Sequence, residues 1–314
     1  MNIYELITTR ICARLEHGVA PWHRPWSDGD LPTNLYSHTP YRGVNVWLLA
    51  AQPYASPYWA TFRQVQAIGG CIRRHEHGTP VVFWKVVESH PDSGDSPTQS
   101  ATKHAPLLRY YTVWNTEQCE LPASLTARLQ EVQQRKGDAL PACEQIVRQM
   151  PHLPALTHGG NQAVYAPRHD CITMPFPVRF ARPEDYYATL YHELCHATGH
   201  RSRLGRPSLQ TPCPFGSAPY GQEELVAEMG AAFICGVAGI APAILDNTAA
   251  YLQFWLQHLR AHPRLLLTTA AQAQKAADYI LGKTATTSPS TSEEQHLTQR
   301  ASLSAPLPAL PVSA

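Results

Sequence analysis

The residues best suited to chemistry in this 314-residue chain lie in one short run, His192-Glu193-Leu194-Cys195-His196. A helix places residues four apart on the same face, so both imidazoles can reach a single cation. Glu193 stands beside the first histidine, where its carboxylate can hold a water molecule on that cation. Zinc lowers the pKa of such a water to about 7, and the glutamate then takes the proton. The run therefore predicts a zinc-dependent metallopeptidase site.

A zinc site of this kind needs a third protein ligand and one open position. Residues 220–236 are predicted to form a helix with Glu224 and Glu228 on one face and small alanines beside them, which would let two helices pack closely. The spacing resembles the second helix of gluzincin-type zinc peptidases, ExxA(D/E). That resemblance implies that Glu224 is the third metal ligand and that Glu228 hydrogen-bonds a ligand histidine from outside the first layer.

Other interpretations stay open at this point. The two histidines could be ordinary residues of a helix, and the glutamate pair could be a solvated helix face. Glu228 could be the ligand in place of Glu224. His200, just past the helix, is interpreted as a capping or surface residue, and Asp170 as a turn residue. Three tyrosines are interpreted as core packing rather than as oxyanion stabilisers: Tyr165, Tyr186 and Tyr187.

The helix that carries the histidines has clear ends. Pro183 fits the first helical position, acidic residues follow it in the first turn, and Gly199 suits the stop. Further helices are predicted at 220–238, 242–261 and 264–281. Two short strands are predicted before the motif, at 162–166 and 171–174. We expect the strand at 171–174 to be the edge strand that pairs with an extended peptide substrate.

The first 120 residues contain six of the seven tryptophans. Residues 1–18 carry apolar side chains at four-residue steps, which predicts an amphipathic helix, and residues 61–68 predict a short one. Strands rich in β-branched and aromatic residues are predicted at 80–87 and 107–114, with a Ser/Pro-rich loop between them. The predicted class is α+β in two domains. The predicted divisions are a small α+β module at 1–125, a helical connector at 126–150, a mostly helical metallopeptidase domain at 151–283 and a disordered tail at 284–314.

Aromatic rings and cations are interleaved in the N-terminal half, as in grooves that stack the bases of single-stranded DNA. The candidate DNA-binding residues are Arg42, Arg63, Arg73, Arg74, Lys85, Arg109, Trp84 and Tyr110. Acidic and basic residues are equal in number over residues 1–120, so no electrostatic signature supports this interpretation. Many of these aromatic side chains could instead belong to the core of a small module.

Composition limits the classes of protein further. The formal net charge is +1, which argues against a strongly cationic nucleic-acid binder. Eight cysteines are scattered without a CxxC pair, which is typical of reduced thiols in the cytoplasm. No run of about 18 apolar residues occurs, so we expect no membrane span.

Dispersed motifs resemble one known family, the ArdC-type antirestriction proteins of conjugative plasmids. They are Pro21-Trp22 with Pro25-Trp26, Tyr41-Arg42-Gly43-Val44-Asn45, Gly69-Gly70, Tyr111-Thr112-Val113-Trp114-Asn115, Tyr165-Ala166-Pro167, residues 192–200 and Glu223-Glu224-Leu225-Val226-Ala227-Glu228. The likeness covers about 280 residues and stops before the C-terminal tail. The run 73–78 departs from the Lys-rich turn that is frequent in the family, which puts the strength of DNA binding in doubt.

The resemblance implies an N-terminal domain that binds single-stranded DNA, followed by a zincin-like metallopeptidase domain, together protecting incoming plasmid DNA from host restriction. It also implies a likeness of the N-terminal part to TraC primases. Zn²⁺ is the expected ion, with Mn²⁺ as the alternative. Double-stranded DNA and a peptide or protein substrate are further candidate partners. Two other functions stay open: a cytoplasmic zinc peptidase with a protein-binding N-terminal half, and a DNA-binding protein with a non-catalytic metal site.

Overall fold

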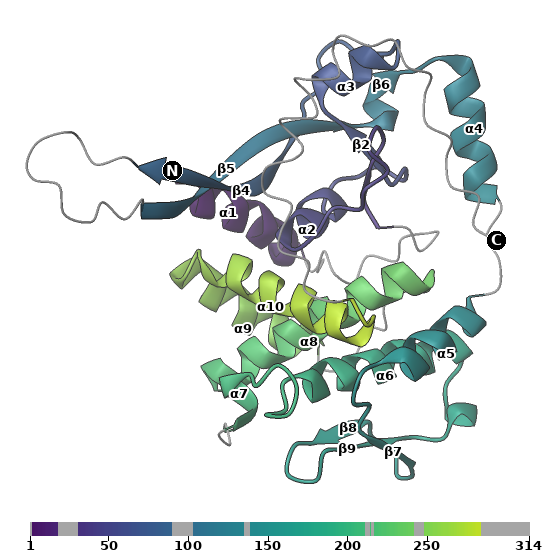
Figure 1. The fold of residues 1–314 in the computed structure, drawn as a ribbon, viewed down its shortest axis with the longest axis vertical. Helices are drawn as coiled ribbons and strands as arrows, with labels where there is room; N and C mark the ends of the chain where they lie inside the picture. The colour runs from purple at the N-terminus through teal and green to yellow at the C-terminus, as the bar shows by residue number, and fades with distance from the viewer. Residues whose placement is uncertain are drawn as a thin grey trace, which may run out of the picture.

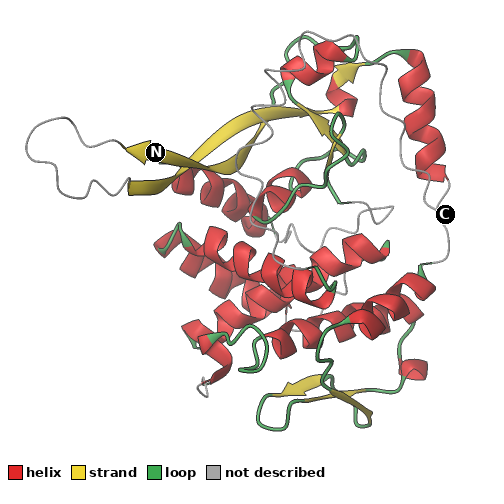
Figure 2. Ribbon diagram, viewed as in Figure 1, coloured by secondary structure: helices red, strands yellow, loops and turns green. Residues whose placement is uncertain are grey.

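The computed structural model describes residues 2–17, 31–89, 103–134, 139–210, 214, 217–241 and 248–283 (Figure 1). A part that contains a long twisted sheet comes first along the chain, and a mostly helical part follows it (Figure 2). This arrangement confirms the α+β class predicted from the sequence. The tail expected at 284–314 lies outside the described residues.

The N-terminal part is built on a long antiparallel hairpin. Its main sheet has the strand order β1-β2-β5-β4, formed by β1 (Thr33–Asn34), β2 (Tyr58–Ala60), β4 (Thr79–Ser89) and β5 (Lys103–Asn115). β4 and β5 pair from Thr79↔Val113 to Ser89↔Lys103. Both strands are longer than predicted, because the ladder continues into residues that were expected to form the loop. Residues 90–102 lie outside the described part of the chain.

Short elements surround this hairpin: α1 (Ile3–Glu16), α2 (Val44–Ala50), α3 (Phe62–Ala67), the strand pair β3 (Cys71–Ile72) and β6 (Cys119–Glu120), and the 3-10 turn Thr116–Gln118. α1 begins with a capping box in which Asn2 and Glu5 satisfy each other's backbone N–H groups. The Asn45 side chain bonds both the N–H and the C=O of Val82, and so fastens α2 to the outer edge of β4.

The C-terminal part contains a small sheet and a group of packed helices. Its elements are α5 (Leu140–Gln149), β7 (Ala155–His158), β8 (Val164–Ala166), β9 (Cys171–Met174), the 3-10 turn Pro177–Arg179, α6 (Pro183–Thr198), α7 (Pro207–Gln210), α8 (Ala218–Ala238), α9 (Thr248–Ala261) and α10 (Leu265–Ile280). The helix α4 (Ala123–Gln134) comes before them and lies beside the N-terminal sheet, where Leu129 packs in a small second core with Tyr58 and Val65 (Figure 1). The four helices predicted in this half correspond to α6, α8, α9 and α10. The strand β7 was not predicted. The sequence divisions at 125 and 150 stay predictions.

One hydrophobic core runs through both parts. Buried apolar side chains of α1, α2 and the hairpin belong to the same cluster as those of α6, α8, α9 and α10. Trp47 of α2 and Phe233 of α8 lie with their ring centroids 4.5 Å apart. Hydrogen bonds also join the two parts: Thr8 Oγ1 donates to Pro263 O at 2.8 Å, and Gly43 N donates to Gln274 Oε1 at 3.0 Å. The two parts are therefore packed as one body.

Long apolar helices of the membrane-spanning kind are absent from the described part of the chain. The longest described helix, α8, is instead buried among α5, α6, α9 and α10. Its apolar character reflects this central position in the core.

Trp47→Ala should lower the free energy of unfolding by about 3–5 kcal/mol, because it removes a fully buried ring and leaves a cavity between the two parts. Denaturant unfolding monitored by circular dichroism measures this loss. Trp84→Ala is the matched control, since Trp84 is 46% exposed and its removal should cost much less. Equal losses in the two variants would contradict a core shared by both parts.

Candidate functional site

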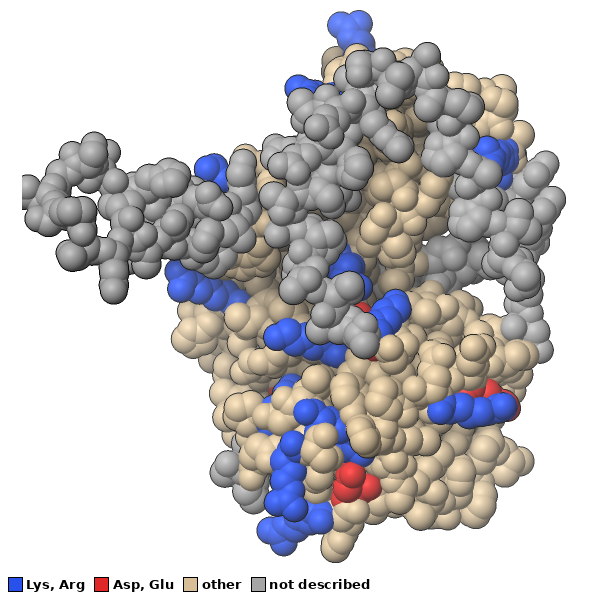
Figure 3. All heavy atoms as spheres, viewed as in Figure 1, with Lys and Arg blue, Asp and Glu red and all other residues tan. Residues whose placement is uncertain are grey.

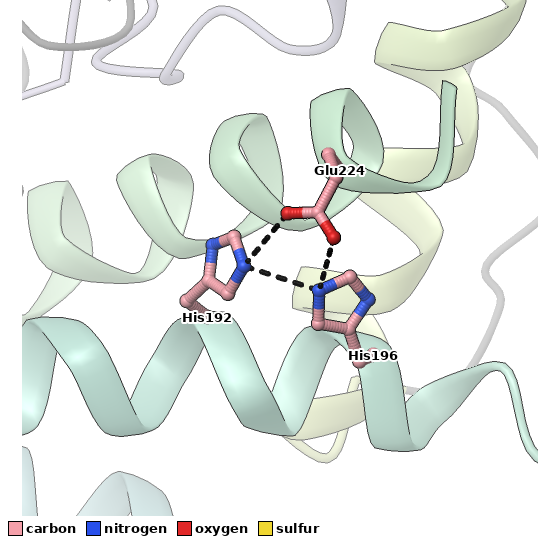
Figure 4. Close-up of side chains that lie close together, drawn as sticks. All are labelled: His192, His196 and Glu224. Atoms are coloured by element: carbon pink, nitrogen blue, oxygen red, sulfur yellow. Dashed lines mark hydrogen bonds and ion pairs between the residues drawn. The ribbon is translucent and has the colours of Figure 1, made fainter. Parts of the chain in front are cut away.

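The two histidines of the HExxH run lie one turn apart on α6. The helix begins as predicted, with Pro183 in the first turn and with Glu184 and Asp185 near its positive end. It ends at Gly199. His192 is buried, and His196 is only partly exposed. Both rings point from α6 toward α8 (Figure 4).

Close packing of α8 against α6 brings a carboxylate to these rings. Gly230 lies at the crossing, where a Cβ atom would stand 2.6 Å from Cys195 Sγ. The small residues of α8 thus permit a separation that larger side chains would prevent. Glu224, near the beginning of α8, faces both imidazoles as a result (Figure 4).

The three side chains are spaced as metal ligands are. The Nε2 atoms of His192 and His196 are 3.1 Å apart. Glu224 places Oε2 3.5 Å from His192 Nε2 and Oε1 3.7 Å from His196 Nε2. A tetrahedral ion bonded at about 2.0–2.2 Å would hold neighbouring ligand atoms about 3.3–3.6 Å apart, a range that these separations bracket. Two imidazoles and a carboxylate in this arrangement could hold a divalent ion.

The electrostatics of the site match a cation position. Burial alone would lower the pKa of His192, but the hydrogen bond to Glu224 and the charges of Glu228 and Glu193 raise it to about 9. Burial alone would raise the pKa of Glu224, whereas its hydrogen bond to His192 and the nearby His196 lower it to about 2. The site therefore favours positive charge between its ligands.

Glu193 is held by the backbone of the neighbouring sheet. Its Oε2 accepts a hydrogen bond of 2.7 Å from the N–H of Tyr165, in β8. The carboxylate is buried beside the first histidine. This contact fixes the side chain that was predicted to take a proton.

The strand at 171–174 is not the edge strand that was expected. The sheet order is β7-β9-β8, so β9 has a neighbour on each side and no free edge for a substrate. β8 is the edge next to α6, and it is only three residues long. The sequence showed two strands but not the third, β7, which occupies the other side of β9.

An outer layer of polar residues supports His196, and the sequence reasoning missed its main member. Glu223 Oε1 lies 3.2 Å from His196 Nδ1. Arg206 pairs with the same carboxylate. Burial alone would raise the pKa of Glu223, but its hydrogen bonds with His196 and Arg206 lower it to about 2. Glu223 stands directly before Glu224, so the glutamate doublet was the available signal. The loop residue Arg206 gave no signal of this kind.

Glu228 was predicted to hydrogen-bond a ligand histidine. Its charge acts on His192, but His192 Nδ1 has no hydrogen-bond partner among the described residues. The role assigned to Glu228 stays a prediction, and Glu223 makes the contact that the structure shows. His200 bonds Ser202 through Nδ1 and belongs to the turn after α6.

The tyrosine hydroxyls considered for oxyanion stabilisation have other partners. Tyr165 donates to Asp170, which occupies the turn between β8 and β9 with a φ of 49°. Tyr186 shares a hydrogen bond with His158 Nε2, and Tyr187 donates to Glu144. These contacts agree with a packing role.

Only some of the candidate DNA-binding residues lie on the β4–β5 hairpin. Trp84 and Tyr110 are 46% and 57% exposed. Because Val82 pairs with Tyr110 and Trp84 pairs with Leu108, both rings stand diagonally on one face of the hairpin. Arg109 alternates to the other face, and Lys85 lies in β4 with a side chain outside the described set.

The remaining four candidates lie elsewhere. Arg63 is exposed on α3, next to Phe62, which packs edge-on against Trp114 with ring centroids 6.4 Å apart. Arg73 and Arg74 are exposed in the turn between β3 and β4. Arg42 forms an ion pair of 2.5 Å with Asp278 of α10, so it joins the two parts of the molecule instead.

Comparison with known proteins identifies both parts. Residues 1–114 match the model for the N-terminal domain of anti-restriction factor ArdC, and residues 141–272 match the model of a zincin-like metallopeptidase. The metal-free crystal structure of ArdC from plasmid R388 superposes with a TM-score of 0.74 at 34% identity, covering 90% of this chain and 98% of that one. The chain belongs to the ArdC antirestriction family.

A second ArdC structure from R388, described as Mn(II)-bound, has a TM-score of 0.71 at 32% identity and covers 92% of this chain and 100% of that chain. The protein y4eC of Sinorhizobium fredii (strain NBRC 101917 / NGR234) is 35% identical over 297 residues, covering 89% of this chain and 91% of its own length. The resemblance to ArdC drawn from the dispersed motifs is confirmed.

Two DNA primases of Escherichia coli, both named TraC, are also related to this ArdC-family chain. They are 33% and 32% identical to it over 295 and 296 residues, 88% of this chain in each case. The matched region is only 20% and 27% of the primases. The likeness to TraC extends beyond the N-terminal part for which it was expected.

The metal-free protein should lose stability as the pH rises from about 6.5 to about 9. Folding raises the pKa of His192 from 6.5 to about 9, so protonated His192 stabilises the folded state. This stabilisation is complete below pH 6.5 and is lost above pH 9. The lowered pKa of Glu224 acts at the acidic end, where stability falls only as the pH drops from 4.5 toward 2. Urea unfolding of chelator-treated protein should show a loss of roughly 3 kcal/mol over the upper window.

Glu224→Gln provides the control for this pH dependence. The amide keeps the size of the side chain but removes the charge that raises the pKa of His192, so the decline between pH 6.5 and 9 should become shallower. An unchanged decline in Glu224→Gln would show that the His192–Glu224 pair is not its source.

Proposed function

We propose that this ArdC-family protein binds single-stranded DNA through the exposed aromatic face of its hairpin and carries a hydrolytic divalent-metal site in its zincin-like part. The two together would protect incoming plasmid DNA from restriction in the cytoplasm. The observation that carries the DNA-binding proposal is the pair Trp84 and Tyr110, large rings that stand in solvent on one face of the β4–β5 hairpin. Aromatic rings that gather in solvent on one face are a common mark of a binding site.

Single strands suit this surface better than duplex DNA. Unpaired bases can stack on the two rings, whereas the bases of a duplex are already stacked on one another. Phe62, 50% exposed and beside Arg63, offers a further ring at the base of the same sheet. On the face shown in Figure 3, basic side chains are dispersed over both halves of the molecule. Stacking, more than charge, is therefore the proposed source of affinity.

The metal site is proposed to be held by His192, His196 and Glu224. Two imidazoles and one carboxylate suit Zn²⁺ and Mn²⁺ alike, and a related ArdC structure is described as Mn(II)-bound. When bound, a divalent ion supplies Lewis acidity that polarises a substrate carbonyl. The donor set and its spacing support this proposal.

Glu193 is the proton acceptor in the proposed hydrolysis of a peptide bond. The Tyr165 N–H holds one carboxylate oxygen, Oε2, and the other oxygen is left to take a proton from water. The short edge of β8 offers little backbone for an extended peptide, since Pro167 directly follows the strand and has no N–H. A non-catalytic metal site is the alternative that this feature favours.

Trp84→Ala and Tyr110→Ala should each weaken binding to a single-stranded oligonucleotide about tenfold, since one base–ring stack is worth about 1–3 kcal/mol. Fluorescence anisotropy with labelled oligo-dT at fixed salt measures the change. Phe176→Ala is the matched control, an exposed aromatic ring on the C-terminal part. Unaltered affinity in both hairpin variants, or equally tight duplex binding, would argue against this surface.

Glu193→Gln should retain one equivalent of bound metal and lose peptide-bond hydrolysis, whereas His192→Ala should lose the metal. Metal analysis of dialysed protein and cleavage of an unfolded protein substrate are the two measurements. Protection of DNA in a conjugation assay then decides between the alternatives. Full protection by Glu193→Gln would mean that hydrolysis is dispensable and that the metal site is structural in this function.

A further inference from the structure

A buried ion pair lies directly behind one of the candidate ligands. We infer that Arg206 and Glu223 act as a positioning pair, which fixes the ring of His196 and thereby sets the affinity of the site for a divalent ion. This inference rests on the metal site proposed above. It adds two residues that touch no ion and no substrate and act only through His196.

Several hydrogen bonds hold the carboxylate of Glu223 in place. Arg206 donates to both of its oxygens, from Nε to Oε2 at 3.0 Å and from Nη2 to Oε1 at 2.5 Å. Ser208 Oγ donates to Oε2 at 2.5 Å. With these bonds in place, Oε1 lies 3.2 Å from His196 Nδ1. The carboxylate therefore has one orientation available, and it is the orientation that faces the histidine.

That contact decides which nitrogen of His196 carries the proton. A carboxylate accepts a hydrogen bond, so Nδ1 must be the protonated atom in neutral His196. The lone pair is then on Nε2, the atom that faces His192 and Glu224. An outer carboxylate on a ligand histidine also makes the imidazole a stronger ligand.

Arg206 extends the same constraint to the end of α6. Its Nη1 donates to Thr198 Oγ1 at 2.7 Å, and its Nη2 donates to Cys195 O at 2.7 Å. Gly199 makes room for it, because a Cβ there would stand 3.0 Å from the guanidinium carbon. One side chain thus ties the last turn of the ligand helix to Glu223 on α8. The positions of the two helices that supply the ligands are coupled through it.

A second arginine–carboxylate pair at the same helix end provides a matched comparison. Arg203 donates to both oxygens of Asp170, at 2.8 and 2.9 Å, and its Nη1 also donates to Ala197 O. Like Arg206, it is buried and holds the end of α6. Unlike Glu223, Asp170 does not contact a candidate ligand. Breaking either pair should cost stability, but only one of them should affect the ion.

The test measures metal affinity by titrating the metal-free protein with Zn²⁺ or Mn²⁺ in a calorimeter. Glu223→Ala should weaken binding about 10- to 100-fold, as expected for loss of an outer partner of a ligand histidine. Glu223→Gln keeps an acceptor for Nδ1 and should lose less. Ser208→Ala removes one hydrogen bond to Glu223 and should give a smaller loss still, with little risk to folding. Asp170→Asn should lower the melting temperature and leave the metal Kd unchanged.

A spectroscopic readout separates positioning from general damage. Cobalt(II) bound to the wild-type protein reports ligand geometry through its visible absorption bands, and Glu223→Ala should shift them, whereas Asp170→Asn should not. Wild-type affinity in both Glu223→Ala and Ser208→Ala would overturn the inference, as would equal losses in Glu223→Ala and Asp170→Asn. Unchanged binding in His192→Ala would instead show that the proposed metal site itself is wrong.

Discussion

The close approach of α6 and α8 is the constraint on which the site depends. The histidines come from one helix and the carboxylate from the other, so their convergence is set by the distance between two backbones. Gly230 permits that distance, because any side chain there would meet Cys195. Large apolar residues elsewhere on α8 hold the helix against its other neighbours. Helix packing, more than the ligands themselves, thus determines the shape of the site.

Local patterns in the sequence predicted the parts of the site that lie on single helices. The spacing of His192 and His196 follows from helix periodicity, and the ends of α6 follow from Pro183 and Gly199. The choice of Glu224 over Glu228 came from the resemblance to gluzincin-type peptidases, and the structure places Glu224 beside both histidines. The support for His196 could not be predicted in this way. Arg206 is a loop residue whose contact with Glu223 exists only after α6 and α8 have packed. Long-range contacts between irregular and helical segments leave no periodic signal.

In the sheets, too, local sequence patterns predicted the strands but not the contacts between distant segments. The strand at 171–174 was predicted, yet its place in the middle of a sheet depends on β7, which the pattern did not reveal. In the N-terminal part, Trp47 and Trp84 are the same residue type in neighbouring elements. One is buried against Phe233 and the other stands in solvent, a difference that composition alone cannot show. For Arg42, the unexpected partner was an aspartate more than two hundred residues away.

The contact of Trp47 with Phe233, which joins the two parts, bears on whether either part can occur alone in other proteins. Separating the two parts would expose apolar side chains of both to water. We therefore expect neither part to be inherited as a domain on its own. In the two longer TraC primases the likeness indeed runs through nearly all of this chain. The hairpin and the histidine helix are therefore retained together in these two relatives.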